Sequence, residues 1–191
     1  MRITVGFLLA LAGTAQAHIT MTKPAPRTTA NKAGPCGTAG STRGTKVATF
    51  APGETITVEW DENVDHPGHY RIAFDDSGDD VFVNPNNPDD NFPFTLMEPI
   101  ADKAGGHYTQ DITLPTTPCD NCTLQLMQIM TTTVPYNSFY YQCADITISG
   151  DVPPGGGGGD DTGDTSGGCS TGTPGGGAIL LALFALMRRR R

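Results

Sequence analysis

The sequence predicts an all-β domain, an antiparallel β-sandwich of the immunoglobulin or fibronectin III type with long loops. Short stretches of alternating apolar and polar residues recur along residues 18–150, and Pro, Gly, Asp or Asn bound each of them. No stretch in this region has the sustained 3.6-residue period of an amphipathic helix. Several short strands separated by turn residues are typical of a sandwich.

The alternation is clearest in two stretches, residues 55–60 and residues 69–74. Residues 75–106 contain several prolines and show little pattern, so we expect one long loop with an acidic, solvated beginning. Other strands are expected from Val47 and at residues 110–114, 123–130 and 144–149. The side chains expected to face the core are Ile56, Val58 and Trp60 in the first stretch, and Tyr70, Ile72 and Phe74 in the second.

Composition divides the 191 residues into four parts. Residues 1–17 have the charged start, apolar run and small residues of a secretory signal peptide. Residues 18–150 have the size of one domain. Residues 151–167 form a linker rich in Gly, Pro and Asp, and residues 168–191 form a C-terminal sorting or membrane-anchor segment. The protein is therefore expected to be exported.

The charge of the chain excludes some partners. The formal net charge is −8 at pH 7, and residues 18–150 carry most of the acidic side chains. An acidic domain is a poor partner for nucleic acid or for an anionic membrane surface. A neutral polymer is compatible with this charge.

Five cysteines in an exported chain favour disulfide bonds over thiol chemistry. The Cys-x-x-Cys pair of Cys119 and Cys122 also resembles a zinc half-site or a redox motif. A disulfide is favoured because no second Cys/His pair with zinc-finger spacing follows, and no βαβ pattern surrounds the motif. We expect Cys36 to pair with Cys143, while Cys169 lies apart in the C-terminal segment.

Cleavage after Ala17 would make His18 the first residue of the mature chain. An N-terminal histidine offers two nitrogen ligands in one chelate ring, its α-amine and its imidazole Nδ1. The amine titrates near ~7.7–8.0, so near neutral pH it gives up its proton readily to a metal. His66, on a Pro-Gly turn, can add a second imidazole. Three nitrogen donors without a thiolate or carboxylate favour copper.

Three sequence features together resemble the lytic polysaccharide monooxygenases. They are the mature N-terminal histidine, HPGHYRIAF at residues 66–74, and FYYQCADI at residues 139–146. The arthropod-type family shares the His-x-Gly strand and the Cys-Ala-Asp-Ile ending, and bacterial monooxygenase-like proteins share HPGHYR and CTLQ. Each motif is weak alone, and the three occur in the order expected after the cleavage site.

This resemblance implies a copper-binding histidine brace made by His18 and His66, with Tyr140 as the axial aromatic residue. His66 is preferred to His69 because it matches the family's His-x-Gly motif without a gap. His69 then begins a strand, where it supports the ligands or faces the substrate. His107 lies on a Gly-Gly turn without a partner motif.

The residue that positions the oxygen species is left open by the resemblance. Ser138 stands two residues before the axial tyrosine, where some fungal relatives have a glutamine. Candidates for this role elsewhere in the sequence are Gln142, Gln128 and Gln125.

The implied activity is oxidative cleavage of an insoluble polysaccharide such as chitin or cellulose by a monomer with one copper ion, using O2 or H2O2 and an external electron donor. The N-terminal segment, the His66 turn and residues 75–106 would form a flat face for the substrate, where Tyr136 could stack on sugars. Two alternatives are a non-catalytic copper-acquisition protein with the same brace and a redox-inactive carbohydrate-binding sandwich.

The C-terminal segment resembles the MYXO-CTERM sorting signal of myxobacteria and their relatives. It combines Cys169, a glycine run, an apolar run and four terminal arginines. The resemblance implies processing near Cys169 and attachment to the cell surface. The alternative is a plain C-terminal membrane anchor, for which the apolar run is short.

Overall fold

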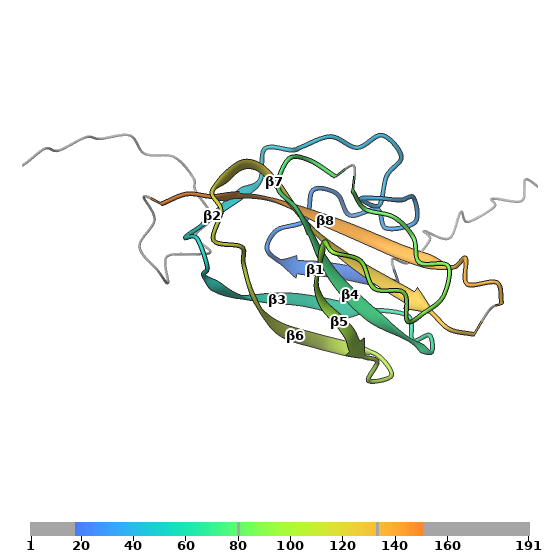
Figure 1. The fold of residues 1–191 in the computed structure, drawn as a ribbon. Coiled ribbons are helices and arrows are strands. Elements are labelled where there is room, and N and C mark those ends of the chain that lie inside the picture. Colours follow the sequence, from blue (N-terminus) through green and yellow to red (C-terminus); the bar gives the residue numbers. More distant parts are fainter. Residues whose placement is uncertain (1–17, 80, 133, 151–191) are drawn as a thin grey trace, which may run out of the picture. The chain divides into compact units, whose positions relative to one another are not determined.

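The computed structural model describes residues 18–79, 81–132 and 134–150, which form two β-sheets and contain no helix (Figure 1). The expectations for residues 1–17 and 151–191, including Cys169, lie outside the described residues. The strands are β1 (Ile19–Lys23), β2 (Val47–Phe50), β3 (Thr55–Glu62), β4 (Gly68–Asp75), β5 (Thr95–Ala101), β6 (Gly106–Thr113), β7 (Cys119–Met130) and β8 (Phe139–Ile148).

The two sheets confirm the predicted all-β sandwich. One has three strands in the order β1-β3-β6, all antiparallel, and the other has five in the order β2-β8-β7-β4-β5. A single pair departs from the antiparallel expectation, since β2 runs parallel to β8. Residues 24–46 leave the three-stranded sheet and enter the five-stranded one, and a parallel neighbour requires a crossover of this kind.

An aromatic cluster joins the two sheets in the core. Trp60 of β3, Tyr108 of β6 and Tyr70 of β4 have ring centroids 4.9 to 5.1 Å apart, and each side chain is at most 1% exposed. Such aromatic contacts stabilise a core beyond the area they bury. The alternation predicted for β3 is confirmed. In β4 the expected core residues Tyr70 and Ile72 are fully buried and Phe74 is half-buried, but the residues between them are buried as well, because the opposite face of this strand is also covered.

The prediction of one long loop over residues 75–106 is wrong in part, because β5 lies inside it and pairs with β4. Pro99 and a run of half-buried residues hide the alternation of β5. The acidic residues at the start of this region were predicted to be solvated, but two of them have partners within the fold. Asp75 is 3% exposed and accepts hydrogen bonds from the backbone nitrogens of Ser77 and Val81, and Asp79 forms an ion pair with Arg27.

The residues before β5 cover the outer face of the five-stranded sheet. Phe82 packs there with Ala73, and the backbone oxygen of Phe94 accepts a hydrogen bond from β4. The guanidinium of the fully buried Arg71 lies 5.2 Å and 5.5 Å from the ring centroids of Phe92 and Phe94. Because both faces of this sheet are covered, nearly all residues of β7 from Cys122 onward and of β8 are buried.

Two disulfide bonds are present, Cys36–Cys143 and Cys119–Cys122. The first attaches the segment after β1 to the outer face of β8. The second spans the register irregularity between Cys119 and Cys122 at the beginning of β7. Both pairings are the ones expected from the sequence.

Residues 24–46 continue the edge of the five-stranded sheet along β8. The backbone nitrogen of Arg27 donates to Cys143 O at 2.7 Å, and Tyr141 N donates to Asn31 O at the same distance. The Arg27 guanidinium forms a bidentate contact with the carboxylate of Asp145, which is 1% exposed, and bonds Asp79 at 2.6 Å. These contacts hold the segment that lies beside the N-terminal strand.

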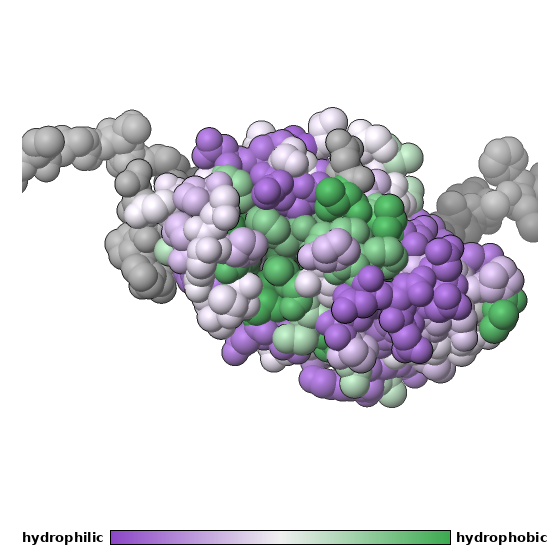
Figure 2. Space-filling model, in the orientation of Figure 1, coloured by the Kyte–Doolittle hydropathy of each residue, from purple (hydrophilic) through white to green (hydrophobic). Residues whose placement is uncertain are grey.

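The face of the domain that Figure 2 displays has an area of exposed hydrophobic residues. Hydrophobic residues gather in the middle of the face that Figure 2 displays, and hydrophilic residues border them. The most exposed large hydrophobic side chains among the described residues are Val134, Val83, Val81 and Val47. The described part of the chain contains no helix long and apolar enough to span a membrane.

Replacing Arg27 with Met should lower the free energy of unfolding by about 3–5 kcal/mol, because it leaves the buried Asp145 carboxylate without its partner. Urea denaturation of Arg27→Met measures the loss. Adding Asp145→Asn to this variant should recover part of it, and Lys46→Met, at an exposed lysine, serves as the control. A loss below about 1 kcal/mol for Arg27→Met would show that the pair does not hold this segment.

Candidate metal centre

His18 lies where the first strand enters the sandwich. It immediately precedes β1, whose Ile19 pairs with Glu62 at the end of β3, and His18 O accepts a hydrogen bond from Asn63 N at 2.9 Å. Gln142 of β8 also holds β1, because its side-chain oxygen accepts a hydrogen bond from the backbone nitrogen of Met21. The backbone of His18 is therefore fixed from both sheets.

His66 lies in the turn between β3 and β4, at the same end of the sandwich. The turn packs against the end of β7, where Thr131 N donates to Pro67 O at 3.1 Å. A Cβ atom at Gly68 would collide with Ile129 O, so only glycine permits this close approach. The Pro-Gly pair after His66 thus places its ring beside the N-terminal strand.

The structure brings His18, His66 and Tyr140 together as a stack of three rings. The ring centroids of His18 and Tyr140 are 4.0 Å apart, those of His18 and His66 are 4.8 Å apart, and the planes differ by 16° and 14°. Tyr140, the second residue of β8, also has its hydroxyl 3.0 Å from His18 Nε2. Residues far apart in the sequence thus meet at one point between the two sheets.

The two histidine rings supply candidate ligand atoms for a metal. His66 Nε2 is buried and has no hydrogen-bond partner, and an unsatisfied buried polar atom is costly unless a ligand takes it up. With His18 Nε2 bonded by Tyr140, a chelate ring with the α-amine would use Nδ1. Two imidazoles and an amine form a nitrogen donor set that suits copper.

Opposite charges flank the two ends of the ring stack. The ammonium nitrogen of Lys32 lies 4.0 Å from the centroid of the Tyr140 ring. At the other end, Glu62 Oε1 accepts a long hydrogen bond, 3.4 Å, from the backbone nitrogen of His66. A cation thus lies over the Tyr140 end of the stack, and a carboxylate lies beside the backbone of His66.

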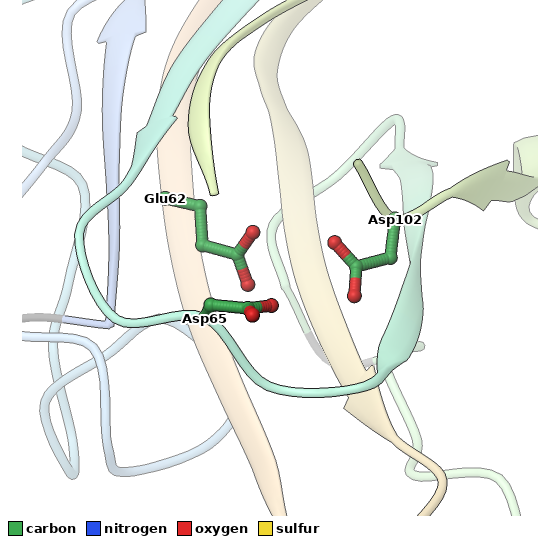
Figure 3. A group of neighbouring side chains, drawn as sticks. All are labelled: Glu62, Asp65 and Asp102. Carbon is green, nitrogen blue, oxygen red and sulfur yellow. The ribbon is translucent and has the colours of Figure 1, made fainter. Parts of the chain in front are cut away.

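Glu62 belongs to an acidic cluster with Asp65 and Asp102, whose side-chain oxygens lie within 4.8 Å of one another (Figure 3). Figure 3 shows the three carboxyl groups turned toward one another, from the end of β3, the turn after it and the end of β5. The hydroxyl of Tyr108 lies 3.0 Å from Glu62 and 2.9 Å from Asp102. Burial, together with these two carboxylates, raises the pKa of Tyr108 to about 12.

The other histidines lie away from the ring stack. His69 points to the face of β4 opposite Tyr70, and its Nε2 lies 3.1 Å from Glu98 Oε1 in a largely buried pair. His107, for which no partner was expected, has Nδ1 2.8 Å from Asp61 Oδ1 on the exposed face of the three-stranded sheet. Neither arrangement resembles the environment of His66.

The three glutamines named from the sequence are all buried, and they have different partners. Gln128 donates to Glu62 at 2.7 Å, behind the His66 turn. Gln142 bonds Met21 and Thr28, so it positions the N-terminal strand. Gln125 donates to Pro35 O on the outer face of the five-stranded sheet. Gln128 and Gln142 therefore support the backbone around the two histidines, while Gln125 holds another loop.

Two residues of this centre were not anticipated from the sequence, Lys32 and Glu62. Lys32 is an exposed lysine in a loop, and no sequence pattern distinguishes it. Glu62, which is 4% exposed, lies on the inward face of β3, in phase with Val58 and Trp60, so extending the alternation by two residues could have found it.

The family model described as "Copper acquisition factor BIM1-like" matches residues 16–157. The structure titled "Lytic Polysaccharide Monooxygenase AA15 from Thermobia domestica in the Cu(I) State" is 22% identical, with a TM-score of 0.35, and the match covers 53% of this chain and 62% of that chain. The match thus spans less than two thirds of that protein. No curated protein matches the sequence.

Proposed function

We propose, on the premise that this chain belongs to the BIM1-like copper acquisition factor family, that residues 18–150 bind one copper ion through His18 and His66. The observation that carries the proposal is the buried, unpartnered Nε2 of His66 beside the ring of His18. The proposal includes export and removal of residues 1–17, since cleavage after Ala17 supplies the α-amine as third nitrogen ligand.

The chain's own residues would prepare this site in three ways. The Gly68 turn holds His66, the Gln142 bond to β1 holds His18, and the Tyr140 hydroxyl on His18 Nε2 directs Nδ1 toward the metal. The lone pair of imidazole lies in the ring plane. Binding of one ion by both rings therefore requires the rings to turn from their stacked arrangement.

Replacing His66 with Ala should weaken Cu(II) binding by more than about 100-fold, because loss of a residue that merely supports a ligand already costs 10–100-fold. His69→Ala is the matched control, three residues away and paired with Glu98. It should keep the metal. Competition with a chelator of known affinity and the Cu(II) EPR spectrum measure both variants, each prepared with His18 as its first residue. Loss of the nitrogen-ligated signal only in His69→Ala would show that His69 is the ligand.

A second candidate function is oxidative cleavage of a polysaccharide such as chitin or cellulose. Tyr140 favours it, because its ring stacks on that of His18 in the place where the resemblance implies an axial aromatic residue. Residues 29–33 and 37–39 line a surface hollow of about 390 Å³, and one of them, Lys32, has its ammonium over the Tyr140 ring. Copper would supply one-electron and oxygen chemistry, with O2 or H2O2 and an external electron donor. Tyr136, which is half-buried, remains a candidate for stacking on sugars.

Incubation of copper-loaded protein with insoluble polysaccharides and a reductant should separate the two functions. Oxidised oligosaccharides in the mass spectrum, absent from His66→Ala, would establish the enzyme. Tight copper binding without oxidised products across chitin, cellulose and other glycans would contradict catalysis and leave copper acquisition. Attachment to the cell surface through residues 168–191 is part of the proposal in either case.

A further inference from the structure

We propose that Lys32 is a positioning residue that biases the site toward Cu(I). This inference rests on the proposed copper binding by His18 and His66. The inference concerns the ratio between the affinity of this site for Cu(I) and its affinity for Cu(II). The basis is a fixed positive charge placed against the ring that covers His18.

The place of Lys32 is set by its neighbours, although its side chain is exposed. The preceding residue, Asn31, is 7% exposed, donates to Ile19 O at 2.9 Å and accepts from Tyr141 N at 2.7 Å. The Lys32 ammonium bonds Phe139 O at 3.5 Å. The loop is thereby fastened to β1 and β8, and the ammonium is held over the Tyr140 ring.

The distances place this charge within range of the proposed ion. Lys32 Nζ is 4.0 Å from the Tyr140 centroid, and that centroid is 4.0 Å from the His18 centroid, so the ammonium is at most about 8 Å from the His18 ring centre. A cation there repels a doubly charged ion about twice as strongly as a singly charged one. Lys32 therefore disfavours Cu(II) more than Cu(I), while Glu62 acts in the opposite sense at the other end.

Lys32→Met tests the charge while keeping most of the side-chain stem. At this distance and in a partly solvated environment, the ratio of Cu(I) to Cu(II) affinity should fall about fivefold. That change lowers the reduction potential by about 40 mV, at about 59 mV per tenfold for one electron. The two affinities are measured by competition with chelators specific for each oxidation state, and the difference should shrink at high salt.

Two further variants serve as controls. Lys32→Arg keeps the charge and should keep the wild-type ratio. Lys46→Met removes an exposed lysine just before β2, far from the ring stack. The next residue, Val47, pairs with Asp145, which at strand spacing lies about 16 Å along β8 from Tyr140. This variant should leave the ratio unchanged.

Each outcome decides the inference. A fivefold change in Lys32→Met alone supports it. An unchanged ratio, or equal changes in both affinities, would overturn it by showing that Lys32 only packs against Tyr140. If the wild-type protein with His18 as first residue bound no copper, the proposed function would fail, and this inference with it.

Discussion

The proposed centre depends on how β1 is held between the two sheets. Ile19 pairs with Glu62 of β3, and Gln142 of β8 accepts a hydrogen bond from Met21. A strand at the end of a chain tends to fray unless its backbone is tied down. Here pairing with the three-stranded sheet sets the register of β1, and the hydrogen bond to Gln142 attaches β1 to the five-stranded sheet. The backbone of His18 is therefore held beside Tyr140, while its ring can still turn.

The same constraint explains several features around the centre. Residues 24–46 run along the edge of β8 and are fastened by Arg27 and by the Cys36–Cys143 disulfide. This arrangement places Lys32 over the Tyr140 ring. On the other side, the buried carboxylate of Glu62 links β3 to Gln128 of β7 and to the His66 turn. Each side of the ring stack is thus supported by a different part of the fold.

Much of this fold could be predicted from the sequence, because strict alternation in β3 and β4 indicates strands with one apolar face. The prediction was wrong for the region of β5, where alternation is lost and the strand contains Pro99. It also missed β1, a short strand directly after the expected cleavage site. The buried pairs of Asp75 and Asp79 could not be anticipated, since their partners lie on distant segments.

The residues of the candidate site, too, could be predicted only in part. His18, His66 and Tyr140 could be named because short motifs surround them, and their assignment as a copper site stays a prediction. Lys32 carries no local signal, since its position follows from the loop along β8. Glu62 continues the inward alternation of the β3 stretch, two residues beyond the part recognised in the sequence. Sequence patterns therefore indicate candidate ligands, while the charges beside those ligands emerge only from the packing of the chain.

The central claim is that the α-amine of His18 joins two histidine rings on one copper ion. The most direct measurement compares Cu(II) affinity and the EPR spectrum of protein beginning at His18 with those of protein carrying one extra alanine before it. The account predicts steep loss of affinity and a changed nitrogen ligation in the extended protein, because its amine lies outside the chelate ring. Equal affinities and identical spectra would contradict it.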